Sequence, residues 1–173
     1  MAKSGVAILG IYVADLAFRA ARQPIMGETI LGSSFAMGPG GKGSNQTVAA
    51  ARAGADVTFI TKLGKDDFGD RALAMYAAEG VTVRAEQVTD NSTGAAYIFV
   101  QDGTGANAII VVAGAAGTIS VDDVERHRSS IENAKVFMTQ LEQPIPAAMR
   151  GLEIAKTAGT ITIFNPAPAA PLD

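Results

Sequence analysis

Residues 38–45 combine glycine with polar side chains in a pattern that can bind an oxygen-rich small molecule. They read Gly-Pro-Gly-Gly-Lys-Gly-Ser-Asn and run directly into an alanine-rich stretch, 46–53, that is typical of a helix. The glycines allow the backbone to adopt positive φ and to approach a ligand closely. Lys42 and Asn45 add polar side chains, and the first N–H groups of a helix have no partner inside it. The segment therefore predicts a donor-rich ligand site.

Two nucleotide-binding interpretations of this segment fail on context. Gly38, Gly40 and Gly43 have the Gly-x-Gly-x-x-Gly spacing of a dinucleotide site, which should follow the first buried strand directly. That strand ends near Ile11, far upstream of the glycines, and the residues between are not helical in pattern. A Walker A phosphate loop needs Ser or Thr after its lysine, whereas Lys42 is followed by Gly43.

A sugar is a better match to the side chains at hand. Sugar hydroxyl groups both donate and accept, so a sugar site needs carboxylates together with amides or amines. Asp15 lies four residues beyond the first predicted strand, and Glu142 lies three beyond the predicted strand 136–139. Ligands of open α/β folds bind at the carboxyl ends of the strands, where Lys42 and Asn45 can join them. The residues alone leave two interpretations open: a sugar site, or surface charges beside a structural turn.

The order of predicted elements favours an α/β fold with a doubly wound, mostly parallel sheet. Short apolar runs that suit strands buried on both faces alternate with helices. The predicted strands are 6–11, 57–61, 136–139 and 160–164, and the predicted helices are 45–53, 66–78, 120–133 and 146–158.

Two segments, 12–37 and 81–113, interrupt this alternation and contain only strand patterns. Residues 101–105 read Gln-Asp-Gly-Thr-Gly, a strong hairpin signal. We expect the two segments to form one small β-sheet lid over the carboxyl ends of the parallel strands. The α/β core would then comprise 1–11, 38–80 and 114–173. Because the last predicted strand is followed only by a loop, we expect the core to be incomplete and the chain to be the front part of a longer protein.

Composition excludes several classes of function. Hydrophobic residues make up 48% and charged residues 18% of the 173 residues, which suits a globular protein. The net charge of −3, with Lys and Arg scattered singly, argues against nucleic-acid or anionic-membrane binding. With one His and no Cys, a His-based zinc site and a Ser-His-Asp triad are excluded, and a cytoplasmic location is expected.

Several short motifs resemble the ribokinase-like (PfkB) carbohydrate kinases, with ribokinases as the nearest members. Gly40-Gly41-Lys42-Gly43-Ser44-Asn45-Gln46 and its helix are similar to the first family signature, as is Gly64-x-Asp66-Asp67-x-Gly69. Further matches follow in the family's order: Gly27-Glu28-Thr29, Ser92-Thr93-Gly94, Gln140-Leu141-Glu142 and Asn165-Pro166-Ala167-Pro168-Ala169.

The resemblance implies a kinase that uses ATP and Mg to phosphorylate a primary hydroxyl of ribose or a related sugar, and a monovalent cation can accompany them in this family. It implies that the lid makes a homodimer, and that Gly64, Asp66 and Gly69 form a helix cap and turn. It implies substrate binding by Asp15, Gly41, Lys42, Gly43, Asn45 and Glu142.

The chain departs from the family pattern at two points. Val13 stands where ribokinases usually carry an Asn that contacts the sugar, so a nucleoside or another sugar is an alternative substrate. The chain also stops before the Asn-x-x-Glu motif and the Asp-Thr-x-Gly-Ala-Gly-Asp signature. Catalytic, cofactor-binding and metal-binding residues, including the general-base Asp, are therefore expected beyond Asp173, and the fragment alone is expected to be inactive. A sugar-binding or dimerising module without catalysis is the remaining alternative.

The lid strands carry apolar residues on both faces. In 94–100 and 107–112, apolar residues are consecutive instead of alternating with polar ones. We expect a second copy to cover the outer face, which predicts a homodimer through 12–37 and 81–113. The alternative is that both faces pack within one subunit.

Overall fold

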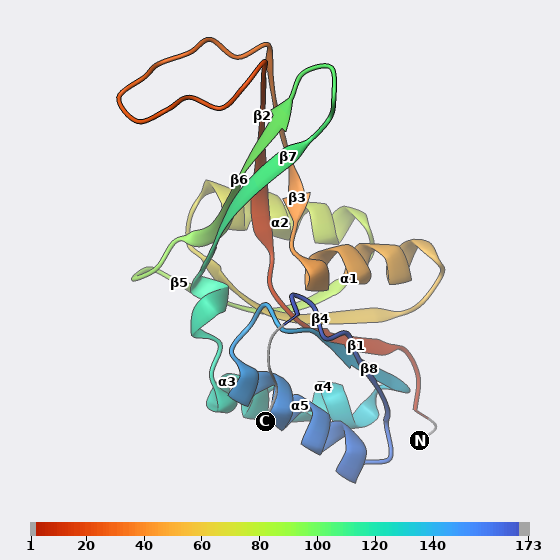
Figure 1. Ribbon diagram of the computed structural model, residues 1–173. Helices are drawn as coiled ribbons and strands as arrows, with labels where there is room; N and C mark the ends of the chain where they lie inside the picture. Colours follow the sequence, from red (N-terminus) through yellow and green to blue (C-terminus); the bar gives the residue numbers. More distant parts are fainter. Residues whose placement is uncertain (1–2, 170–173) are drawn as a thin grey trace.

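Parallel strands form the main sheet of the protein (Figure 1). The computed structural model describes residues 3–169. In spatial order the sheet consists of β5 (Thr82–Val88), β4 (Val57–Gly64), β1 (Val6–Leu9), β8 (Val136–Thr139) and β9 (Ile161–Phe164). Every neighbouring pair runs parallel.

Helices cover both faces of this sheet, as the alternation of buried strands and helices predicts. On one face lie α1 (Lys42–Arg52) and α2 (Asp67–Ala78); on the other lie α3 (Val121–Arg126), α4 (Arg128–Asn133) and α5 (Ile145–Thr157), preceded by the short 3₁₀ turn η1 (Ala115–Thr118). Alternate residues of β1 enter different cores: Ile8 packs on the α1–α2 side, and Ala7 and Leu9 on the α3–α5 side. None of the helices within residues 3–169 is long and apolar enough to cross a membrane.

A second sheet, which we call the lid, stands over the carboxyl ends of the main sheet (Figure 1). In spatial order it consists of β3 (Ser34–Gly40), β2 (Val13–Ala20), β6 (Thr93–Gln101) and β7 (Asn107–Gly114). β2 and β6 are parallel, and the outer strands pair antiparallel to them. The hairpin predicted at 101–105 joins β6 to β7.

The structure confirms the predicted fold class, an α/β protein with a parallel sheet and a small β-sheet lid. It corrects the assignment of 81–88 to the lid, because β5 pairs with β4 along its whole length, from Thr58↔Thr82 to Gly64↔Val88. β5 is an edge strand with one covered face, so polar residues such as Arg84 and Glu86 occupy its other face. That mixed polarity made it resemble a lid strand. The other predicted domain boundaries stay a prediction.

Candidate functional site

A single glycine connects the lid to α1. β3 ends at Gly40 and α1 begins at Lys42, so Gly41 makes the whole connection. Its φ of 93° lies in the left-handed region, and a Cβ there would lie 2.5 Å from the carbonyl oxygen of Ile11. The same oxygen accepts a hydrogen bond of 3.2 Å from the Ser44 N–H. The turn therefore fixes the start of α1 against the connection between β1 and β2.

The Glu142 carboxylate, from the residues after β8, caps α1. Gly41 has no side chain with which to cap the helix, and Glu142 Oε2 accepts a hydrogen bond of 2.6 Å from the Lys42 backbone N–H. Glu142 Oε1 accepts one of 3.0 Å from Lys42 Nζ. The Glu142 side chain is only 14% exposed, and a negative charge at a helix N-terminus is favourable. Lys42 and Glu142, predicted at strand and helix ends, thus meet directly.

Asp15 lies in β2, between Gly38 of β3 and Ala96 of β6. A Cβ on Gly40 would overlap both carboxylate oxygens of Asp15, so the carboxylate lies directly over this glycine. Burial raises the pKa of Asp15 above its ordinary value of 3.8, and the negative charge of Glu142 raises that pKa further. The Glu142 charge therefore acts on Asp15 at the base of the lid.

Asn45 and Gly43 complete the first turn of α1. Asn45 is exposed, one turn beyond Lys42, and its side chain makes no hydrogen bond within residues 3–169. Gly43 is buried, and a Cβ there would lie 2.7 Å from the Gly10 Cα, so the helix and the end of β1 are in close contact. The predicted residues 41–45 therefore share one helix start, where the Asn45 amide faces solvent.

Gln140, which the sequence pattern presents only as part of a short motif, lies among the residues of this site. Its side chain is fully buried, and Nε2 donates to Gln46 Oε1, which links the end of β8 to α1. Gln140 Oε1 has no hydrogen-bond partner among the described residues, and a Cβ on Gly10 would lie 2.5 Å from it. The sequence signal that could have indicated a role for Gln140 is its position as a polar residue directly after a buried strand.

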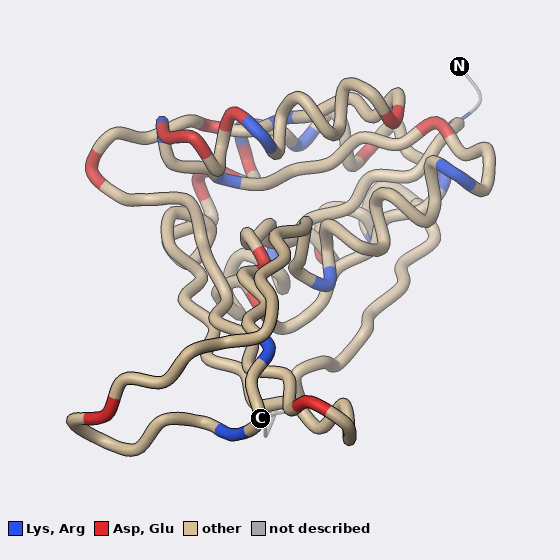
Figure 2. Tube along the Cα trace, turned by 90° about the horizontal axis from the view of Figure 1, so that it is seen from above, with Lys and Arg blue, Asp and Glu red and all other residues tan. Residues whose placement is uncertain are grey.

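The site suits hydroxyl groups better than a phosphate. Because the N–H and Nζ of Lys42 both donate to Glu142, a carboxylate already occupies the helix start that binds phosphate in nucleotide sites. Carboxylates at Asp15 and Glu142 accept hydrogen bonds, whereas Lys42 and Asn45 can donate them. Acidic and basic residues are interspersed along the described chain (Figure 2).

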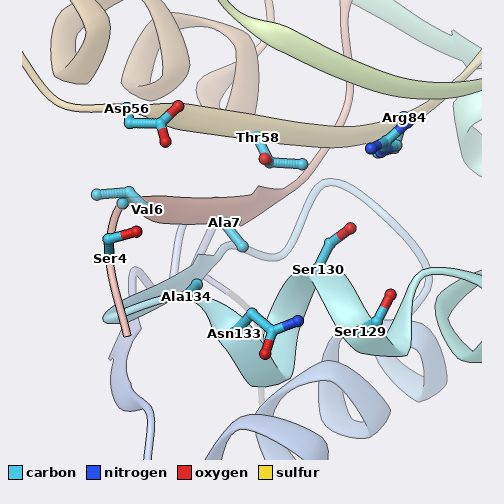
Figure 3. A pocket seen from close by; sticks show the side chains of 11 residues that line it. Ser4, Val6, Ala7, Asp56, Thr58, Arg84, Ser129, Ser130, Asn133 and Ala134 are labelled. Carbon is cyan, nitrogen blue, oxygen red and sulfur yellow. The ribbon is translucent and has the colours of Figure 1, made fainter. Parts of the chain in front are cut away.

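A polar cavity lies at the opposite ends of the strands (Figure 3). It measures about 310 Å³ and is bounded by the starts of β1 and β4 and by α4. Asp56 and Arg84 lie on the sheet side, and Ser130 and Asn133 lie on α4. The cavity shares no residue with the site around Asp15 and Glu142, and the sequence analysis did not predict it.

Residues 3–172 match the model of the pfkB family of carbohydrate kinases, and the chain belongs to this family. It is 39% identical to the ribokinase of Mus musculus over 167 residues, which cover 96% of this chain and 51% of that protein. It is 33% identical to the deoxyribokinase of Salmonella typhi over 165 residues, which cover 95% of this chain and 54% of that protein.

A solved structure of Arabidopsis thaliana ribokinase, complexed with ribose and ATP, superposes with a TM-score of 0.82 at 29% identity. The match covers 96% of this chain and 54% of the plant protein. The chain thus spans about half the length of the curated relatives it matches.

Asp15 provides a stability test of the site's electrostatics. Because burial and Glu142 raise its pKa, the folded chain binds this proton more tightly than the unfolded chain, and the charged form destabilises the fold at neutral pH. We expect Asp15→Asn to raise the melting temperature at neutral pH by about 1–2 °C, since solvent screens a half-buried charge. The gain should vanish as the pH falls below 3.8, where both states are protonated.

Thermal melts across the acidic range measure this difference. Asp90→Asn, at an exposed aspartate in the loop between β5 and β6, is the matched control and should leave the melting temperature unchanged. A lower melting temperature for Asp15→Asn at neutral pH would contradict the interpretation.

Proposed function

We propose that this chain is the sugar-binding part of a cytoplasmic, ATP-dependent kinase that phosphorylates a primary hydroxyl of ribose or a related sugar. The observation that carries the proposal is the convergence of Asp15, Lys42 and Glu142, from β2, α1 and the end of β8, under the lid. Membership of the carbohydrate kinase family supports it. So does the likeness to a ribokinase complexed with ribose and ATP.

Each site residue has a role that follows from its chemistry. Asp15 and Glu142 would accept hydrogen bonds from sugar hydroxyls, and Asn45 would donate to a sugar oxygen. The Lys42 ammonium would stay paired with Glu142 and direct one carboxylate oxygen toward the ligand. Gly41 and Gly43 allow the backbone to approach the sugar closely. Together these residues would hold the sugar in one orientation, which is the main requirement of phosphoryl transfer.

The lid would close the site against water. Water that reaches the transferred phosphoryl group would hydrolyse ATP without product, so kinases exclude it by closing elements over the substrate. Asp15 is itself a lid residue, so sugar binding and closure would be coupled through one carboxylate.

We expect the ATP platform, the metal site and the general-base aspartate to lie beyond Asp173. ATP bound there would supply the phosphoryl group, with Mg and, in this family, a monovalent cation as companions. The residues of this chain would bind and orient the acceptor sugar. The start of α1 does not fit the nucleotide, because Glu142 already satisfies its N–H and its lysine.

Two features widen the range of sugars to be tested. Val13 is 3% exposed and offers no hydrogen-bonding group, so a sugar hydroxyl in front of it would lack a partner. The likeness to a deoxyribokinase points in the same direction. Deoxyribose is therefore the second candidate substrate, with nucleosides and other sugars as further alternatives, and a sugar-binding or dimerising module without catalysis is the non-enzymatic one.

Phosphorylation assays test the proposed function directly. A complete kinase that contains this chain should phosphorylate ribose or deoxyribose from ATP, and the 173-residue chain alone should show no turnover, because it would lack the base. Ribose, deoxyribose, fructose and adenosine form the substrate panel. If the complete protein phosphorylates no sugar and no nucleoside, the proposed kinase activity is wrong. If the 173-residue chain alone shows turnover, the expectation that it lacks the general base is wrong.

The lid also suggests a homodimer. Ile109, Ile110, Val111 and Val112 of β7 are each 52–65% exposed, so the described residues of this chain leave both faces of the strand open to a partner. The register divides them between two faces. Val111 lies beside Ala96, on the Asp15 face of the sheet.

The opposite face is the better candidate for an interface. Ile110 pairs with Tyr97, whose ring lies 5.8 Å from that of Phe18, and Phe18 in turn lies 4.9 Å from Phe35. This aromatic face is exposed and does not carry Asp15. A second copy of the same face would bury it in a self-complementary contact.

Paired substitutions separate the two faces of the lid. Ile110→Asp with Val112→Asp should give monomers, because two charges would be buried in the interface. Ile109→Asp with Val111→Asp, on the Asp15 face, is the matched control and should remain dimeric. Sedimentation velocity measures both. An unaltered chain that is monomeric at micromolar concentration would rule out the lid dimer.

A further inference from the structure

A group of hydrogen bonds between Thr93, Gly64 and Asp66, which we call the joint, connects the lid to the end of the main sheet. Thr93, the first residue of β6, is 3% exposed. Its Oγ1 accepts a hydrogen bond of 2.9 Å from the Gly64 N–H and donates one of 3.3 Å to the Gly64 carbonyl oxygen. Its own N–H donates to Asp66 Oδ2 at 2.7 Å. The side-chain hydroxyl and the backbone N–H of Thr93 therefore both bond to the turn that leads from β4 into α2.

Asp66 serves two elements at once. Its Oδ1 accepts a hydrogen bond of 2.9 Å from the Gly69 N–H and caps α2, while Oδ2 holds the Thr93 N–H. From the sequence, only the cap and turn are predictable. An asparagine could still cap the helix through its single oxygen, but its NH₂ group would then face a second donor.

The joint also holds the return of the chain from the lid. The Ala115 N–H, directly after β7, donates to the Ser92 carbonyl oxygen at 2.7 Å. A Cβ on Gly64 would lie 2.7 Å from the carbonyl carbon of Ser92, so the two segments touch with no space for a side chain between them. The start of β6 and the end of β7 are therefore held together at one place beside the main sheet.

The position of the joint also affects the position of Asp15, through the pairing of β6 with β2. β6 pairs with β2 from Val13↔Gly94 onward, and Asp15 lies beside Ala96, three residues along β6 from Thr93. At the rise of an extended strand, the joint is about 10 Å from the residue that faces Asp15. A tilt of β6 at the joint would therefore move the Asp15 carboxylate relative to Lys42 and Glu142.

We propose that Asp66 and Thr93 are positioning residues that set the angle of the lid at which Asp15 meets the sugar. The inference rests on the proposed sugar-binding function for its kinetic consequence, whereas its structural consequence is independent of that function.

Hydrogen exchange on the 173-residue chain tests the joint itself. Asp66→Asn and Thr93→Val should speed exchange of the β6 and β7 amides about tenfold, the equivalent of one lost hydrogen bond to a charged or buried group. Amides of β8 and α5 should be unchanged. Asp67→Asn makes the same change at the exposed neighbouring residue and should have no effect, and Thr93→Ser, which keeps the hydroxyl, should match the unaltered chain.

Kinetics of a complete kinase that contains this chain tests the positioning role. The KM for the sugar should rise about tenfold in Asp66→Asn and Thr93→Val, while the KM for ATP stays within about twofold. Equal changes in both KM values, or a sugar KM that does not change, would overturn the positioning role. Unchanged amide hydrogen exchange in β6 would contradict the claim that Asp66 and Thr93 hold the lid strands. If the unaltered kinase phosphorylates no sugar, the proposed function fails. The hydrogen-exchange result then still tests whether Asp66 and Thr93 hold the lid strands.

Discussion

The arrangement of the site depends on one constraint, the turn at Gly41. The chain must leave the lid and enter α1 within one residue, and the nearby carbonyl of Ile11 leaves no room for a Cβ. The helix therefore has no side chain of its own to cap its N-terminus. Glu142 supplies the missing acceptor from the end of β8 and pairs with the lysine next to the turn. Through this carboxylate, one turn determines the partner of Lys42 and the negative charge that adds to burial in raising the pKa of Asp15.

The lid brings a second carboxylate to the start of a helix. It contributes Asp15 from β2, while Lys42 comes from α1 and Glu142 from the residues after β8. Hydrogen bonds such as that between the Thr93 N–H and Asp66 connect the lid to the main sheet, and the pairing of β6 with β2 holds the lid strands together. The apolar residues on β7 are exposed in the single chain, and this exposure supports the proposal that a second copy covers them. Under the proposed function, the same strands would link sugar binding, closure and assembly.

Much of the fold could be read from the sequence because its main signals are local. Buried strands such as β1 are continuous apolar runs, and Asp66 and Ser120 occupy recognisable cap positions. The meeting of Lys42 with Glu142 was predictable because parallel strands end at a common edge. The direct contact between them was not, since it depends on the missing cap at Gly41.

The errors have physical causes as well. β5 was assigned to the lid because an edge strand with one covered face has the mixed polarity of a lid strand. The predicted helix 120–133 is divided at His127 into α3 and α4, a break that no glycine or proline marks. Gln140 was missed because its contacts with Gln46 and Gly10 join residues distant in the sequence.

The central claim is that the base of the lid binds a sugar, and backbone amide NMR of the 173-residue chain tests it most directly. Titration with ribose or deoxyribose should shift the resonances of Asp15, Lys42 and Asn45, and ATP should leave them unchanged. The shifts should be lost in Glu142→Gln, which removes the charge that holds Lys42. Shifts confined to the opposite cavity, around Arg84 and Asn133, or no response to any sugar, would contradict the account.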